Sequence, residues 1–389
     1  MKRILKLVLL AALVHSASSS AESPPVAKLK PKAKPDYQYL SKGIEVPAAT
    51  AGEPKVKAFG PDTILAAKQY LDDGAHHWVR EKSCVACHST GVYMVERPVL
   101  TPLLGKPSAE VHASFVEGVR ATVGKPTLRN GVKVFGDSVM SVWRSSGLAA
   151  WDKHVTGTLS KHTDKSLRQT LLCLADEGLI KTINQVEIPY ITTDFELTVQ
   201  AARAIATAPG WLATVKDEDT LERIERMQTY LRQHVPISDY ELALKLQLAV
   251  LMPDLVPQSQ REAAIAMLWK QQRPDGGWST RRMSDLMKWH ENMDPKVIAM
   301  IRGEPDAASP ASDPYMTAWA IVLLRESGTP TNDARIQKGI VWLKQNQRVS
   351  GRWWMKSLFR DTYHYSTYIS TAQALRALAL CGEIPSLTP

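Results

Sequence analysis

Two cysteines three residues apart, followed directly by a histidine, carry the most specific chemistry in this chain. Cys84, Cys87 and His88 form a Cys-x-x-Cys-His pattern, the spacing of covalent c-type haem attachment. In such a site each thiol adds to one vinyl group of the porphyrin, and the adjacent imidazole becomes the proximal ligand of the iron. The sequence therefore predicts one covalent haem c, anchored by Cys84 and Cys87, with His88 as the iron ligand.

The same residues allow two other interpretations. Cys84 and Cys87 could form a redox-active disulfide, because a Cys-x-x-Cys pair at a helix start lowers a thiol pKa. They could also bind zinc, which would need further ligands from distant parts of the chain. The remaining cysteines, Cys173 and Cys381, fall within helical segments and are expected to be buried thiols rather than a bridge.

A sixth iron ligand is not specified by the pattern. A five-coordinate iron would favour ligand or peroxide chemistry over simple electron transfer. The side chains that the fold could bring to the iron are Met94, Met140, His76, His77, His234, His290 and His364.

The N-terminal segments predict export. Met1–Ala21 combines early basic residues, an apolar run and a stretch of small residues, as in a cleaved signal peptide, and the run is too short to span a bilayer. Residues 22–57 are rich in lysine and proline and predict a flexible linker. We therefore expect a periplasmic or secreted protein with no transmembrane segment after cleavage.

Most of the formal net charge of +9 comes from the leader and the linker. The remaining globular part, residues 58–389, is only weakly basic, and it contains no nucleic-acid-binding motif. The composition therefore argues against a nucleic-acid partner, while the oligomeric state cannot be read from it.

Repeated units fill the globular part. A helical stretch followed by Gln-x-x-x-Gly-x-Trp occurs at Gln272–Trp278 and again at Gln347–Trp353, and each is followed by a second helix rich in small residues. Weaker units begin at 66–71, 167–173 and 226–231. A repeat of this length indicates an array of helix pairs.

These repeats resemble those of the squalene–hopene cyclase and prenyltransferase superfamily, in particular a secreted bacterial subgroup with a Cys-x-x-Cys-His motif followed by Tyr-Met and Arg-Pro, as at Cys84–Pro98. The resemblance implies an all-α fold, an α/α toroid of paired inner and outer helices. It also implies that the glutamine caps an outer helix and stacks on the tryptophan, and that the loops before the inner helices lie on one rim beside a central cavity. The haem motif would then lie on that rim, as would the long insertion at 279–312, which could be a lid, a docking loop or a tolerated surface excursion.

The chemistry of the cyclases is not expected to carry over. Their Asp-x-Asp-Asp acid motif is missing, since the nearest text, Lys216–Thr220, has a different spacing and precedes an outer helix. The zinc ligands of the protein prenyltransferases are incomplete, because Asp313-Pro314-Tyr315 has tyrosine where their cysteine stands. No catalytic residue can therefore be assigned from the sequence.

The expected function is periplasmic electron transfer or redox chemistry by a haem-bearing toroid with a periplasmic redox partner. The alternative is a toroid without redox activity that binds a hydrophobic or carbohydrate ligand in its cavity, with Cys84 and Cys87 as a structural disulfide. A terpene cyclase is a third possibility, disfavoured by the missing acid motif.

Overall fold

The computed structural model describes residues 37–82, 85, 87–121, 126–129, 132–135, 138–182, 193–283, 299, 301–357 and 364–387. The chain divides into two units, Met1–Lys34 and Pro35–Pro389. The first unit, and with it the expected signal peptide, lies outside the described residues, so export stays a prediction. In the described part of the chain no helix is both long and apolar enough to cross a bilayer.

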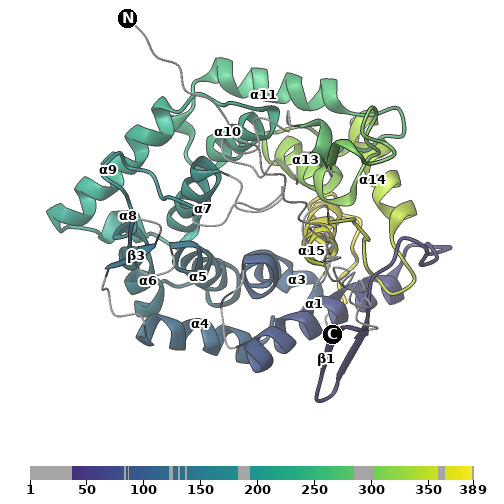
Figure 1. Cartoon of the computed structure of the whole chain (residues 1–389), viewed down its shortest axis with the longest axis horizontal. Helices are drawn as coiled ribbons and strands as arrows, with labels where there is room; N and C mark the ends of the chain where they lie inside the picture. Colours follow the sequence, from purple (N-terminus) through teal and green to yellow (C-terminus); the bar gives the residue numbers. More distant parts are fainter. Residues whose placement is uncertain are drawn as a thin grey trace, which may run out of the picture. The chain divides into compact units, whose positions relative to one another are not determined.

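Helices of the second unit alternate between an outer and an inner ring (Figure 1). The outer helices are α1 (Pro61–Lys82), α4 (Ala109–Ala121), α6 (Lys161–Leu171), α9 (Glu218–Gln233), α11 (Gln258–Gln271) and α14 (Ala334–Asn346). The inner helices are α2 (Val92–Glu96), α5 (Ser138–Trp151), α7 (Asp194–Thr207), α10 (Asp239–Leu251), α13 (Pro314–Glu326) and α15 (Tyr365–Leu380). Short helices α3 (Thr101–Leu104) and α8 (Trp211–Thr214) lie in the connections.

The inner ring closes on itself. Along the chain α2 packs on α5, α5 on α7, α7 on α10, α10 on α13 and α13 on α15, and α15 returns to α2. This closure is the defining feature of an α/α toroid, and the predicted fold class is confirmed. The pair α4 and α5 was not predicted, because a hairpin of β3 (Pro126–Arg129) and β4 (Val132–Phe135) follows α4 instead of a Gln-x-x-x-Gly-x-Trp turn.

Burial explains which helices are inner. Every residue of α13 from Pro314 to Leu324 is buried, as expected for a helix with neighbours on all sides. Outer helices such as α6 bury only one stripe. The inner helices α7, α10 and α13 begin at Thr193, Ser238 and Asp313, whose side chains accept a hydrogen bond from the backbone N–H three residues on, the usual helix N-cap.

The Gln-Gly-Trp motif joins each repeat to the next, but its hydrogen bonds differ from those that the resemblance implied. The tryptophan, not the glutamine, satisfies the end of its own outer helix: Trp353 Nε1 donates to the carbonyl oxygen of Leu343 at 2.8 Å. Gln347 Nε2 donates to the carbonyl oxygen of Gly351 in its own loop and to that of Thr63 at the start of α1, both at 2.9 Å. The equivalent bonds of the preceding repeat join Trp278 to Leu268 and Gln272 to Gly276 and Arg335.

The glycine of the motif is required by the neighbouring helix. Gly351 has a φ of +84°, and a Cβ there would come within 2.3 Å of the backbone nitrogen of Ala67 in α1. Gly276 and Gly178 make the same close approach to α14 and α9. The motif is therefore a contact between successive outer helices as well as a tight turn.

The expected linker over 22–57 is wrong for residues 37–57, which are ordered. Strands β1 (Tyr37–Ser41) and β2 (Ile44–Pro47) form an antiparallel hairpin, and the segment after it packs on the last motif. Val56 N donates to the carbonyl oxygen of Gln347, and buried Arg352 pairs with Glu53 at 3.0 Å. The apolar-poor segment is held by hydrogen bonds to residues almost 300 positions away, which composition does not reveal.

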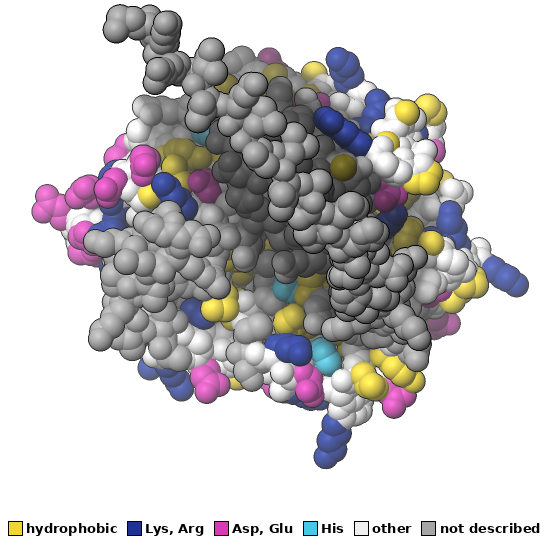
Figure 2. All heavy atoms as spheres, viewed as in Figure 1, with side chains coloured by type: hydrophobic (Ala, Val, Ile, Leu, Met, Phe, Trp, Pro, Cys, Tyr) yellow, Lys and Arg dark blue, Asp and Glu magenta, His cyan; other side chains and the backbone are white. Residues whose placement is uncertain are grey.

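Charged side chains of both signs alternate around the periphery (Figure 2). Acidic residues gather where α9 lies, and lysines and arginines are spread around the ring between them. On the part of this face that the structure describes, the basic side chains do not form a continuous surface.

We expect Trp278→Phe to lower the free energy of unfolding by about 1–3 kcal/mol, because it leaves the buried carbonyl of Leu268 without its donor. Trp354→Phe is the matched control, since the Trp354 indole makes no hydrogen bond within the described residues, and it should change stability by less than about 0.5 kcal/mol. Urea unfolding followed by circular dichroism measures both. Equal effects of the two variants would contradict the role given to the motif tryptophan.

Candidate functional site

The predicted haem motif lies where α1 leads into α2. Cys87–Gly91 form one turn of π-helix directly before α2. Cys84 and the side chain of Cys87 lie outside the described residues. Their roles as haem anchors, as a disulfide or as zinc ligands therefore stay predictions.

His88 is packed between aromatic rings. Its ring centroid lies 4.9 Å from that of Trp78, with the planes perpendicular, and 3.6 Å from that of Tyr365. Burial lowers the pKa of His88 to about 3, so the imidazole is neutral at physiological pH. Its Nε2 atom is buried.

Three of the histidines proposed as sixth ligands bond to other side chains. His76 and His77 bond through their rings to Ser108 and Ser41, and His234 bonds to Glu241. Met94 is fully buried in α2 and Met140 lies in α5, while His290 is outside the described residues. The segments of His77 and His364 are brought against His88 through their neighbours Trp78 and Tyr365.

Metal and thiol chemistry find no further support in the described part of the chain. There, no group of three or more histidine, cysteine, aspartate or glutamate side chains is arranged to hold a metal ion. Cys173 and Cys381 are not joined in a disulfide, as predicted. The core of the insertion, 284–298 and 300, is outside the described residues, so its role as a lid or docking loop stays a prediction.

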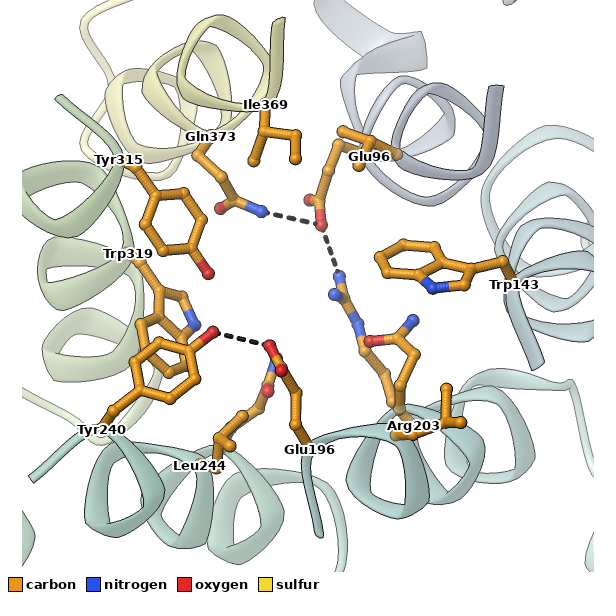
Figure 3. A pocket seen from close by; sticks show the side chains of 14 residues that line it. Glu96, Trp143, Glu196, Arg203, Tyr240, Leu244, Tyr315, Trp319, Ile369 and Gln373 are labelled. Carbon is orange, nitrogen blue, oxygen red and sulfur yellow. Dashed lines mark hydrogen bonds and ion pairs between the residues drawn. The ribbon is translucent and has the colours of Figure 1, made fainter. Parts of the chain in front are cut away.

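A central cavity lies inside the ring of inner helices, along their N-terminal halves (Figure 3). Its empty space, open mouth included, is about 640 Å³. Aliphatic, aromatic and polar side chains from all six inner helices line it: Val92, Glu96, Trp143, Glu196, Leu197, Gln200, Arg203, Tyr240, Leu244, Gln247, Tyr315, Trp319, Ile369 and Gln373. None of them was singled out from the sequence.

A buried ionic network forms one wall of this central cavity. Glu96 accepts hydrogen bonds from Arg203 at 3.0 Å, from Arg376 at 2.7 Å and from Gln373 at 3.1 Å. Burial alone would raise the pKa of Glu96, but the two guanidinium groups outweigh it and hold that pKa at about 2. Glu96 is therefore ionised, and it ties α2 to α7 and α15.

Aromatic rings form the facing wall. Trp319 lies 5.1 Å from Tyr240 and 5.9 Å from Tyr315, measured between ring centroids. The Tyr240 hydroxyl donates to Glu196 at 2.7 Å, as the close view shows (Figure 3). Burial raises the pKa of both tyrosines far above its usual range, so they remain neutral hydroxyls beside a carboxylate.

Three buried polar atoms of the lining have no hydrogen-bond partner within the described residues. They are the donors Trp143 Nε1 and Gln200 Nε2 and the acceptor Gln373 Oε1. The orientation of Gln373 is fixed, because its Nε2 donates to Glu96. Since buried polar groups in native proteins are nearly always satisfied, these three atoms are candidates to bond a molecule held in the cavity.

In sequence, no known protein family and no curated protein matches the chain. Among solved structures, the type II terpene cyclase MstE from Scytonema is similar at 18% identity and a TM-score of 0.46, over 84% of this chain and 98% of that one. The ent-copalyl diphosphate synthase from Streptomyces platensis is similar at 14% identity and a TM-score of 0.43, over 75% and 50%. A protein from Actinoplanes is similar at 15% identity and a TM-score of 0.35, over 82% and 99%.

The fold is an α/α toroid, as the closed ring of inner helices shows. The expected function, haem-based electron transfer or redox chemistry in the periplasm, is wrong, because the similar structures of known activity are terpene cyclases. The alternative interpretation, a toroid that binds a ligand in its cavity without redox activity, agrees better with these neighbours. A secreted haem-bearing subgroup finds no support among them.

Proposed function

We propose that the central cavity binds a neutral, polyhydroxylated ring compound of the carbohydrate class, without redox chemistry. The observation that carries this proposal is the set of three buried polar atoms without a partner in the described residues, Trp143 Nε1, Gln200 Nε2 and Gln373 Oε1, on side chains that line one cavity. A hydroxyl group both donates and accepts, so a molecule with several hydroxyls can satisfy two donors and one acceptor together.

The same atoms disfavour a purely hydrophobic ligand. A hydrocarbon would displace water from the cavity and leave the three polar atoms unsatisfied, at about 1–3 kcal/mol each. Burial of its own apolar surface would have to offset that cost. A sugar ring avoids it, because its hydroxyls replace the bonds that water would otherwise make.

The walls of the central cavity also suit a sugar. Trp319, Tyr240 and Tyr315 offer flat apolar surfaces with polar edges, against which the C–H face of a sugar ring can pack.

The ionic network around Glu96 does not provide the protonated acid that a cyclase requires. Protonation of a hydrocarbon needs a carboxyl group that keeps its proton, whereas Glu96 is held ionised by Arg203 and Arg376. Asp313, whose pKa burial raises to about 6, accepts hydrogen bonds from Thr280 and from the start of α13 and does not line the central cavity.

We expect Gln200→Leu to weaken binding of the tightest neutral disaccharide in a panel of cellobiose, maltose and chitobiose by roughly tenfold, about 1.4 kcal/mol. The reason is the loss of a donor to one sugar hydroxyl. Isothermal titration calorimetry of the full-length protein measures the change. Gln258→Leu, on the exposed face of α11, is the matched control and should bind as the wild type does. Equal affinities of all three proteins would place the sugar elsewhere.

A further inference from the structure

A second cavity lies at the other end of the inner helices. It is bordered by the C-terminal parts of α2, α5, α7, α10, α13 and α15, and its empty space, open mouth included, is about 1020 Å³. Arg203 lines both cavities, so the network of Glu96, Arg203 and Arg376 separates this C-terminal cavity from the central one. The function proposed for the central cavity does not use it.

Positive charge predominates on the lining of the C-terminal cavity. Lys153, Arg203 and Arg376 line it, together with one acidic residue, Glu326, which pairs with Arg376. Glu96 lies behind the two arginines and neutralises part of their charge. Lys153 is exposed and has no ion pair within the described residues.

The pKa of His154 shows that the electrostatic field in the C-terminal cavity is positive. Burial lowers the pKa of His154, and Lys153, Arg376 and Arg203 lower it further, to about 4 against a smaller opposing effect of Glu96. Three cations therefore act on one half-buried imidazole, and they outweigh the carboxylate nearby. A bound anion would be attracted by the same field.

The rest of the lining is apolar. Val95, Val99, Val250 and Leu251 face the cavity together with several alanines. A bare inorganic ion would leave this surface exposed to water, whereas an anion with a short hydrocarbon chain would cover it.

We propose that the C-terminal cavity binds a small organic anion, a carboxylate on a short aliphatic chain. The carboxylate lies beside Lys153, His154 and the two arginines, and the chain lies against the valines and Leu251. Cations also stabilise helix C-termini without any ligand, and the experiment below separates that role from anion binding.

The test uses hexanoate as the probe and the His154 ring as the reporter, in NMR titrations of the full-length protein. Saturating hexanoate is expected to raise the His154 pKa by at least about one unit, because the anion reverses part of the local field. Hexanol, with the same chain and no charge, should leave it unchanged.

Lys153→Met should weaken the hexanoate effect by about tenfold in half-saturating concentration, while Lys216→Met, on an exposed loop outside the cavity, should leave it as in the wild type. The proposal is overturned if hexanoate does not shift His154, if hexanol shifts it as much, or if both lysine variants respond alike. Both variants change exposed side chains, so the fold is preserved in each.

Discussion

Glu96→Gln is expected to lower the free energy of unfolding by about 3–5 kcal/mol, because it leaves the guanidinium group of Arg203 buried without its counter-ion and leaves Arg376 with Glu326 alone. The network joins three inner helices, so the loss should appear as a shift of the whole cooperative transition. Urea unfolding followed by circular dichroism measures it.

The matched control is Glu110→Gln. Glu110 forms a bidentate pair with Arg80, but both side chains are exposed, and such pairs contribute less than about 1 kcal/mol. If Glu96→Gln costs no more than this control, the Glu96 carboxylate is not the buried charge described above.

The pH dependence of stability provides a second measure of the same network. The pKa of Glu96 is about 2 in the folded protein, below its ordinary value of 4.5, so its stabilisation is present above pH 4.5 and is lost as the pH falls toward 2. The difference corresponds to about 3 kcal/mol. This part of the acid destabilisation should be absent from Glu96→Gln, and a variant with the wild-type pH profile would contradict the assignment.

Gly351→Ala is expected to lower the free energy of unfolding by about 3–5 kcal/mol. The added methyl group would lie 2.3 Å from a backbone atom of Ala67, which cannot yield as a flexible side chain would, and overpacking of this kind adds to the cost of a positive φ. Because α14 meets α1 at this point, the substitution acts where the last repeat joins the first. Thermal and urea unfolding measure the loss.

Gly328→Ala measures the cost of placing an alanine at a positive φ without a steric clash. Gly328 also has a positive φ, +98°, but no atom lies within 4 Å of the position of its Cβ. It should cost only about 1–2 kcal/mol. Similar losses in the two variants would mean that the contact with α1 contributes nothing to closure of the ring.

The repeats made the toroid predictable. Gln272–Trp278 and Gln347–Trp353 mark turns that each fasten one outer helix to the next, so their spacing reports helix pairs directly. The pair α4 and α5 has a β-hairpin in place of the motif, so the repeat pattern in the sequence did not predict this pair. The ordered segment 37–57 was missed because its partners lie around residue 350, and a local composition does not contain them.

The residues of the candidate site could not be predicted from the sequence in the same way. Trp143, Gln200 and Gln373 belong to three different helices, and nothing in their local sequence distinguishes them from other inner-helix residues. The one available signal was Glu96, an acidic residue within a run of buried side chains (Val92–Glu96), because a buried carboxylate requires partners. The Cys-x-x-Cys-His motif, by contrast, is specific in sequence, but its described side chain, His88, packs against Trp78 and Tyr365 and is not among the residues that line the central cavity.

The most direct test of the central claim is a competition for the central cavity, measured as tryptophan fluorescence of the full-length protein. Trp143 and Trp319 line that cavity, so an occupant should change their emission. The account predicts a saturable change with at least one of the neutral disaccharides, lost in Trp319→Ala, and no displacement of the sugar by farnesol. A saturable response to farnesol with none to any disaccharide would contradict it.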